Sequence, residues 1–521
     1  MDASLLNNTT RIAKNTLLLY CRTLFNMVVS LYTSRIVLLT LGVEDYGIYN
    51  VVGGFVVMFA VLLSSLTGAV GRFLTFELGK GDQEKLNQTF SAALIIHAIL
   101  SITILLFAET IGLWFLNAKM NIPVERMYAA NWVFQCSLFG LILGILNTPY
   151  IATIISHERM NAFAYIGIFE VMIRLLAVLS LAYVPLGTDK LIVYAVLCLC
   201  TGLLVIMVYI AYCRKHFTEC RCGFSLNKKI LKNMLTFAGW NFVGTLATAS
   251  KDQGVNILLN LFCGPIVNAA RGLAYAVNSA VSIFVGNFLT ALNPQITKSY
   301  AAENHDFAIF LVQRGSRFAF YILFILALPF FFETDFVLTL WLKDYPEHTT
   351  NFVRLVLMIS LCDIFSFTLA TLQSATGKIR DIQIVIGIVV CLNFPVSYVF
   401  LKMGYAPEST MLTAIAISLC GLLLRLIILR KTVQFSIRYY VIHVLGNVLL
   451  VSVCAAILPS IIYYNFPAGV MRFVFTGITC VISTSGVVFW IGCSRSERAF
   501  IWQKCVIAYN TLRNKIKAIR K

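Results

Sequence analysis

The chain has 521 residues, of which 59% are apolar and only 12% are charged, and its mean hydropathy is +0.84. A soluble domain usually carries about 25% charged residues, so this composition excludes a sizeable soluble domain. Apolar runs of the roughly 20 residues that one helical membrane crossing needs recur along the chain. A β-barrel would instead show alternating strands of about 10 residues. The sequence therefore predicts an all-α polytopic membrane protein.

About fourteen apolar segments are long enough to cross a bilayer, and most of the loops between them are short. In the first half they cover 16–39, 46–71, 90–116, 128–154, 161–184 and 190–213. In the second half they cover 234–261, 265–292, 316–341, 351–375, 381–401, 408–430, 440–464 and 468–493. Because no small-residue cleavage site follows the first run, we expect a retained first helix rather than a signal peptide.

The basic residues predict the orientation of these helices. With the N-terminus placed inside, 28 of the 41 Lys and Arg residues fall in inner segments, 6 in outer loops and 7 within spans. Inner loops of membrane proteins are enriched in Lys and Arg, so we expect both termini in the cytoplasm. The net charge of +18 then belongs to inner loops, and no nucleic-acid partner is expected. The basic, partly apolar tail 494–521 predicts an amphipathic helix on anionic lipid.

The two halves of the chain resemble each other at a shift of 218 residues. This shift brings 11–15 onto 229–233, Asn50 onto Asn268 and Gly54 onto Gly272. Six helices separate the copies, so both have the same orientation, as in a parallel repeat. We predict two six-helix lobes, 1–213 and 234–430, joined by a basic linker, 214–233, and followed by an extra helix pair, 440–493. A structural repeat within a membrane enzyme is the alternative.

Some charged residues fall deep inside predicted spans, where each costs about 2.5–3.5 kcal/mol on insertion scales. Lys251 and Asp252 are adjacent on one helix and point about 100° apart, so they do not fully neutralise each other. Arg271 follows on the next helix, and Arg35 lies on the first. We predict that Lys251, Arg271 and Arg35 form a cationic lining of a central cavity, suited to a phosphate or pyrophosphate group.

The buried carboxylates form a second set of candidates. Asp252, Glu170 and Asp363 are predicted to couple transport to a cation or proton. Glu170 and Arg174 are four residues apart on one helix face, so a structural ion pair between them is the competing interpretation.

Other site types find no support in the sequence. There is no Walker-type phosphate loop and no potassium-filter motif. The outer loops are too short for a catalytic domain. The group Cys213, His216, Cys220 and Cys222 matches no standard zinc spacing. We therefore predict no catalytic residue, no metal and no cofactor, and a secondary transporter rather than an enzyme.

Two N-terminal segments carry a resemblance to a known family. They are 11–20, RIAKNTLLLY, and 34–54, SRIVLLTLGVEDYGIYNVVGG. They resemble bacterial polysaccharide transporters, including the O-antigen flippases, in which a Leu-Gly-x-x-x-Tyr/Phe-Gly-like turn joins the first two helices. That family belongs to a superfamily that also includes multidrug and toxic-compound extruders and the lipid II flippase.

The resemblance implies a V-shaped pair of lobes in the bacterial inner membrane. By alternating access it would move undecaprenyl-diphosphate-linked oligosaccharide, a repeat unit of O-antigen, capsule or exopolysaccharide, from the inner to the outer leaflet. The last helix pair would shelter the lipid tail, and the polysaccharide polymerase and chain-length machinery would be partners. Two alternatives stay open: a cation-coupled multidrug extruder, and a membrane glycosyltransferase or polymerase.

Overall fold

The structure is a computed structural model, and it describes residues 3–57, 61–118, 122–183, 189–221, 227–342, 345–433, 435–499 and 502. All regular elements within these ranges are helices, in agreement with the predicted all-α class. Helices suit a bilayer because each one satisfies its backbone hydrogen bonds internally. In the described ranges, eleven helices are long and apolar enough to cross a membrane.

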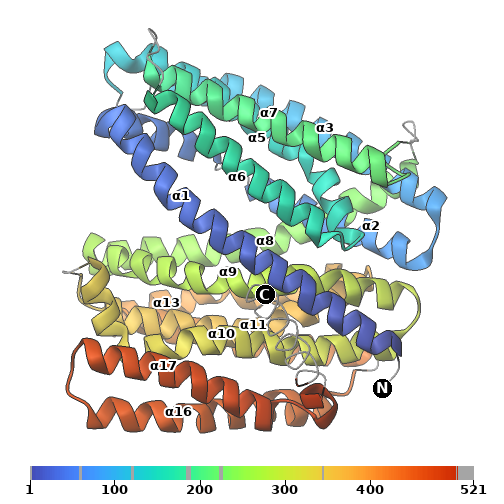
Figure 1. Cartoon of the computed structure of the whole chain (residues 1–521), viewed down its shortest axis with the longest axis vertical. Helices are drawn as coiled ribbons and strands as arrows, with labels where there is room; N and C mark the ends of the chain where they lie inside the picture. Colours follow the sequence, from blue (N-terminus) through green and yellow to red (C-terminus); the bar gives the residue numbers. More distant parts are fainter. Residues whose placement is uncertain are drawn as a thin grey trace, which may run out of the picture.

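The first group of helices lies at the top of Figure 1. It comprises α1 (Ala3–Val57), α2 (Val61–Lys80), α3 (Gln83–Phe107), α4 (Leu113–Ala118), α5 (Met127–Ser156), α6 (Met160–Tyr183) and α7 (Lys190–His216). A π-turn, Ala108–Gly112, joins α3 to α4, and a 3₁₀ turn, Val124–Arg126, precedes α5. From the N-terminus, α1 runs past α9 of the second group and then joins the first group.

The second group lies below it. It comprises α8 (Lys228–Cys263), α9 (Pro265–Ala301), α10 (His305–Leu342), α11 (Thr349–Ala375), α12 (Arg380–Cys391), α13 (Asn393–Lys402), α14 (Ser409–Val433), α15 (Ile437–Tyr440), α16 (Asn447–Asn465) and α17 (Val470–Val487). The π-turns Val441–Gly446 and Val488–Gly492 follow α15 and α17.

The turn of the resemblance motif lies inside α1. Gly42 has φ 81° and ψ 170° there, so the helix is interrupted at this residue. This left-handed conformation favours glycine because it has no Cβ. Three residues later, Asp45 accepts hydrogen bonds from Arg126, which also donates to Asp189 at 2.7 Å. The motif thus makes a sharp turn. The ion pairs of Arg126 with Asp45 and Asp189 connect this turn to the starts of α5 and α7.

Eleven of the fourteen predicted spans coincide with the helices that are apolar enough to cross a membrane. The predicted spans 16–39, 46–71 and 234–261 are largely helical too, but they are not among these eleven. In α8, only Gly254–Cys263 stands out as an apolar stretch. The total of fourteen therefore stays a prediction, as do the domain boundaries. The predicted amphipathic tail lies outside the described residues, except for 494–499 and Trp502.

Ion pairs join α17 and the segment that follows it to α10, and Tyr321 of α10 makes a hydrogen bond to Asn447 of α16. Toward one end, Glu333 of α10 has a side chain only 1% exposed and accepts hydrogen bonds from Arg472 of α17 at 2.8 and 3.1 Å. Toward the other end, Glu497 pairs with Arg314 and Arg317 of α10. Burial alone would raise the pKa of Glu497, but the charges of Arg317 and Arg314 hold this pKa below its ordinary value. The pair therefore belongs mechanically to the second group.

Removing Arg472 should destabilise the protein, because Glu333 would stay buried without a counter-charge. Breaking a buried ion pair costs about 3–5 kcal/mol, whereas replacing both partners by apolar groups is often nearly neutral. We expect Arg472→Leu to lower the melting temperature in detergent by several degrees, and Glu333→Leu/Arg472→Leu to recover most of the loss. Size-exclusion chromatography after heating measures both; a double variant as unstable as the single one would contradict this account.

Candidate functional site

The predicted charges of α8 and α9 meet in one cluster. Arg271 is 5% exposed, and its guanidinium donates to the Asn256 side chain and, at 3.1 Å, to the Tyr275 hydroxyl. One of its nitrogens lies 3.9 Å from a carboxylate oxygen of Asp252, whose side chain is 38% exposed. The ring of Tyr275 also lies under the guanidinium, 4.4 Å away. Arg271 is therefore a paired, buried cation.

Lys251 differs from its neighbour Asp252. Its side chain is half-buried, and no hydrogen bond or ion pair joins it to another residue in the described part of the chain. Arg35 lies on α1, but its side chain is outside what the structure describes. Among the three predicted cavity cations, Arg271 is paired with Asp252 and the Arg35 side chain is not described. Lys251 is the one whose described side chain has no ion partner among the described residues.

The partners of Arg271 also carry a signal in the sequence. Asn256 is four residues after Asp252, and Tyr275 is four residues after Arg271. Residues at this spacing are neighbours on one helix face. A polar stripe on each helix therefore marks the face on which α8 and α9 meet.

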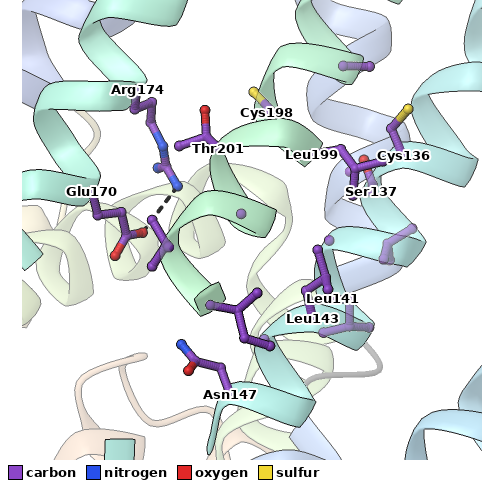
Figure 2. A pocket seen from close by; sticks show the side chains of 18 of the residues that line it. Cys136, Ser137, Leu141, Leu143, Asn147, Glu170, Arg174, Cys198, Leu199 and Thr201 are labelled. Carbon is purple, nitrogen blue, oxygen red and sulfur yellow. Dashed lines mark hydrogen bonds and ion pairs between the residues drawn. The ribbon is translucent and has the colours of Figure 1, made fainter. Parts of the chain in front are cut away.

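A cavity of about 830 Å³ lies inside the first group, between α1, α5, α6 and α7. Glu170 and Arg174 of α6 form part of its wall. Their side chains point toward each other in Figure 2 and form an ion pair of 3.5 Å. Both are partly exposed, at 35% and 55%. The structure thus brings the two residues together as an ion pair in the cavity wall.

Arg22 of α1 lies in the wall of the same cavity. Its guanidinium stacks over the ring of Phe163 at 4.2 Å, and it packs so closely against Gly167 that a Cβ at this position would overlap it. Its Nε atom is buried without a hydrogen-bond partner among the described residues. A buried donor without an acceptor costs about 1–3 kcal/mol. The structure thus places the Arg22 side chain in the wall of the cavity.

Asp363 of α11 makes a contact of its own within the second group. It accepts a hydrogen bond from Ser418 of α14, so this carboxylate bridges two helices of the second group. Further along the same two helices, Arg425 of α14 donates to the Gln373 side chain of α11 at 2.8 Å. The three carboxylates predicted for coupling therefore lie in three different settings: an ion cluster, a cavity wall and a bridge between helices.

The end of the bundle that carries most of the basic residues, here called the basic end, is where the two groups touch. Glu158, in the turn between α5 and α6, has a side chain 2% exposed and receives a hydrogen bond from Lys298 of α9 at 2.9 Å. Gln295 of α9 donates to the other carboxylate oxygen. Glu158 has φ 58°, an uncommon backbone conformation for a non-glycine residue.

In a second contact at the basic end, the donor belongs to the first group and the acceptors to the second. Arg72 of α2 donates to the carbonyls of Ser374 and Ala375 at the end of α11, both at 3.0 Å. A cation suits this position because the last carbonyls of a helix are unpaired and carry partial negative charge. Nearer the membrane centre, Asn287 of α9 donates to Thr23 of α1 at 2.7 Å. In each contact a polar side chain of one group reaches the other group.

The neighbouring turn at the basic end is also ordered by charge. His157 contacts Glu219 at 2.6 Å and stacks on Phe217. Burial raises the pKa of the Glu219 carboxyl, but the bonds from His157 and from the backbone bring this pKa below its ordinary value. Glu219 is therefore ionised at neutral pH.

The fold is similar to that of solved transporters. An outward-facing multidrug resistance transporter of the MATE family, in the MOP superfamily, matches with a TM-score of 0.68 at 15% identity, over 82% of this chain and 96% of that one. A MOP superfamily transporter from Pyrococcus furiosus, described as having a binding pocket of reversed polarity, matches with a TM-score of 0.65 at 14% identity, over 81% and 96%. These similarities establish the fold.

Sequence comparison identifies relatives more specifically. The uncharacterized membrane protein EpsK of Bacillus subtilis (strain 168) is 25% identical over 158 residues, which are 30% of this chain and 31% of EpsK. The match thus spans about a third of that relative. The family model described as polysaccharide biosynthesis protein matches residues 12–300, more than half of the chain. The chain therefore belongs to the polysaccharide biosynthesis protein family and is a multi-pass membrane protein with the fold of the MOP superfamily transporters.

Proposed function

We propose that this protein is a flippase for lipid-linked oligosaccharide, which it moves from the inner to the outer leaflet by alternating access. Membership of the polysaccharide biosynthesis family is the observation that carries the proposal. The transporter fold supports it, because two helix groups that touch at one end can separate there while closing at the other. The undecaprenyl-diphosphate carrier and the repeat unit of O-antigen, capsule or exopolysaccharide are part of the proposal.

We place the basic end in the cytoplasm, since cytoplasmic loops are enriched in Lys and Arg, and the protein in the bacterial inner membrane with both termini inside. The contacts of Glu158 with Lys298, and of Arg72 with the end of α11, then close the route to the cytoplasm. In this arrangement the structure corresponds to the state that releases cargo outward.

The diphosphate of the carrier needs cations that are not already neutralised. Lys251 in the second group and Arg22 in the first group meet this condition among the described residues. Arg271 contributes by holding Asp252 on the face of α8 next to Lys251, and Arg35 stays a candidate on α1. Arg and Lys side chains are the usual phosphate ligands of proteins.

The lipid tail needs an apolar surface, and one lies beside the C-terminal pair. A groove of about 490 Å³ runs between α10, α11 and α16, and is lined by Phe and aliphatic side chains together with Met358, Cys362 and Ser452. Since α16 supplies one wall, the groove depends on this helix of the extra pair. It supports the proposal that the pair shelters an isoprenoid chain.

The fold alone also fits a cation-coupled multidrug extruder, because the solved neighbours are MATE transporters. Asp252, Glu170 and Asp363 are our candidates for coupling to a cation or proton in either case. The family match favours polysaccharide export over drug export. Functional contact with a polysaccharide polymerase and chain-length machinery is part of the flippase proposal.

Deleting the gene from its native host distinguishes the two functions. A flippase deletion should remove surface polysaccharide and accumulate lipid-linked repeat units on the inner leaflet, with unchanged drug tolerance. Surface polysaccharide is measured by gel staining, and the intermediate by mass spectrometry of lipid extracts. Drug sensitivity with intact polysaccharide would contradict our proposal and support the multidrug extruder instead.

Lys251 provides a test of the cavity. Lys251→Ala should reduce restored polysaccharide in the deletion strain at least about tenfold, because a lost contact between two charged groups is worth roughly 1.5–3 kcal/mol. Lys251→Arg keeps the charge and should restore most of it. The matched control Lys402→Ala removes a cation at the end of α13, outside the predicted cavity, and should leave polysaccharide normal. Equal membrane expression is verified by immunoblot; full activity of Lys251→Ala contradicts the assignment.

Lys298 provides a test of the closed basic end. Lys298→Gln leaves the buried Glu158 carboxylate without its ion partner, so the closed state should lose at least about 1 kcal/mol, or fivefold in population. Spin labels at Arg159 and Asn304, in a cysteine-free background, report the separation of the two groups by pulsed electron resonance. Lys298→Arg should stay closed, and so should Lys85→Gln, whose pair with Asp82 is exposed and lies within one group. Unchanged distances in Lys298→Gln would contradict the role of this ion pair.

A further inference from the structure

A second pocket, of about 850 Å³, opens at the basic end where the two groups meet. Arg72 and Phe73 of α2 form its wall on the side of the first group. Residues of α8 and the segment 376–381, which joins α11 to α12, form the rest. We call it the seam pocket, because each group supplies part of its wall.

The seam pocket has a strong excess of positive charge. Arg72, Lys232, Lys378 and Arg380 line it, against the single carboxylate of Asp381. No ion pair joins any of these four cations to a carboxylate in the described ranges. The carbonyls of α11 balance Arg72 in part, but the other three side chains are exposed and have no such partner. Gathering like charges around one concave surface is unfavourable unless an anion is close.

Arg72 is held in place on this wall by neutral groups. Its guanidinium lies 4.6 Å from the ring centre of Phe73 and 5.4 Å from that of Phe237. A guanidinium has five N–H donors, and the carbonyls of Ser374 and Ala375 take two of them. The side chain is thus positioned in advance, and it keeps donors for a ligand.

An indole ring in the wall indicates the level of the pocket relative to the lipid headgroups. The guanidinium of Arg380 lies 5.4 Å from the ring centre of Trp240 on α8. Tryptophan is enriched at the level of the lipid headgroups. The pocket also includes the start of α12 at Arg380, where unpaired backbone N–H groups favour an anion. Together with the basic side chains, these features suit a phosphate group at headgroup level.

We propose that the seam pocket binds a phosphate-bearing anion, either the headgroup of an anionic lipid or a free phosphate compound. Because its walls come from both groups, the anion binds the state in which they touch and stabilises that state. The proposal is independent of the transported cargo, so a failure of the flippase assignment leaves it unaffected. It assigns a function to basic residues that the predicted cavity does not use.

Binding can be measured on the purified full-length protein in a neutral maltoside detergent. The probes are dihexanoyl phosphatidic acid, sodium pyrophosphate and, as a neutral lipid, dihexanoyl phosphatidylcholine, titrated by microscale thermophoresis at low salt. Lys378→Ala/Arg380→Ala should weaken binding of the anions at least tenfold. The control Arg430→Ala/Lys431→Ala removes the same charge at the end of α14, outside the pocket, and should bind as the wild type does. Melting temperatures establish that both variants are folded.

The outcomes separate the two sources of the phosphate. Binding of both anions supports a site for phosphate in general, binding of phosphatidic acid alone supports a lipid headgroup, and binding of pyrophosphate alone supports a soluble anion. If neither anion binds, or if phosphatidylcholine binds equally well, the proposal is overturned. An equal loss in the Arg430/Lys431 control also overturns it, because net charge would then explain the binding.

A separate measurement tests whether the bound anion stabilises the state in which the two groups touch. With spin labels at Arg159 and Asn304, the bound anion should increase the population with the short distance at least twofold in Lys298→Gln, where the closed state is weakened. The same addition should have no effect when Lys378→Ala/Arg380→Ala is combined with Lys298→Gln. An anion that binds without changing these populations would refute the coupling between the pocket and closure.

Discussion

The close approach of α2 to α9 at the basic end is the constraint on which the rest of this arrangement depends. Gly79 allows it, because a Cβ at this position would lie 2.8 Å from both the Ala301 Cβ and the Lys298 carbonyl oxygen. Once the two backbones are this close, Lys298 reaches Glu158 across the boundary, and Arg72 reaches the end of α11. The seam pocket is a further consequence, since its two walls exist only while the groups touch.

The chain accommodates charge inside the bilayer in three ways. Arg271 is neutralised by Asp252 and solvated by polar side chains at helical spacing. Asp363 accepts a hydrogen bond from the Ser418 hydroxyl on the neighbouring helix α14. Arg22 lies in a cavity, where its free Nε needs water or a ligand. Arg271 and Asp363 are thus occupied by protein partners, whereas Arg22, like Lys251 of α8, has no ion partner among the described residues. The cost of a charge within the membrane is therefore not by itself evidence of a binding residue.

Sequence reasoning worked where the interactions are local and failed where they are distant. Apolar length predicted the helical class, and the four-residue spacing of Glu170 and Arg174 anticipated their contact. Nothing in the sequence links Glu158 to Lys298, 140 positions away, because this contact depends on how two helix groups pack. Arg72 escapes pattern reasoning for another reason: its acceptors are backbone carbonyls, which every residue has. The polar helix α8 shows a third limit of apolar length as a guide to membrane helices. A helix that packs against several others, as α8 does against α2, α9 and α12, does not need a continuous apolar sequence.

The C-terminal pair shows how a groove and a moving boundary can coexist in one bundle. Glu333 with Arg472, and Glu497 with Arg314 and Arg317, bind α17 and the segment after it to α10. Tyr321 of α10 makes a hydrogen bond to Asn447 of α16. The groove between α10, α11 and α16 therefore lies within one body and keeps its shape when the two groups separate. The seam pocket, in contrast, must open. A lipid tail held in the groove would travel with the second group, while an anion in the seam pocket would resist that movement. Tail binding and gating thus act on different parts of the fold.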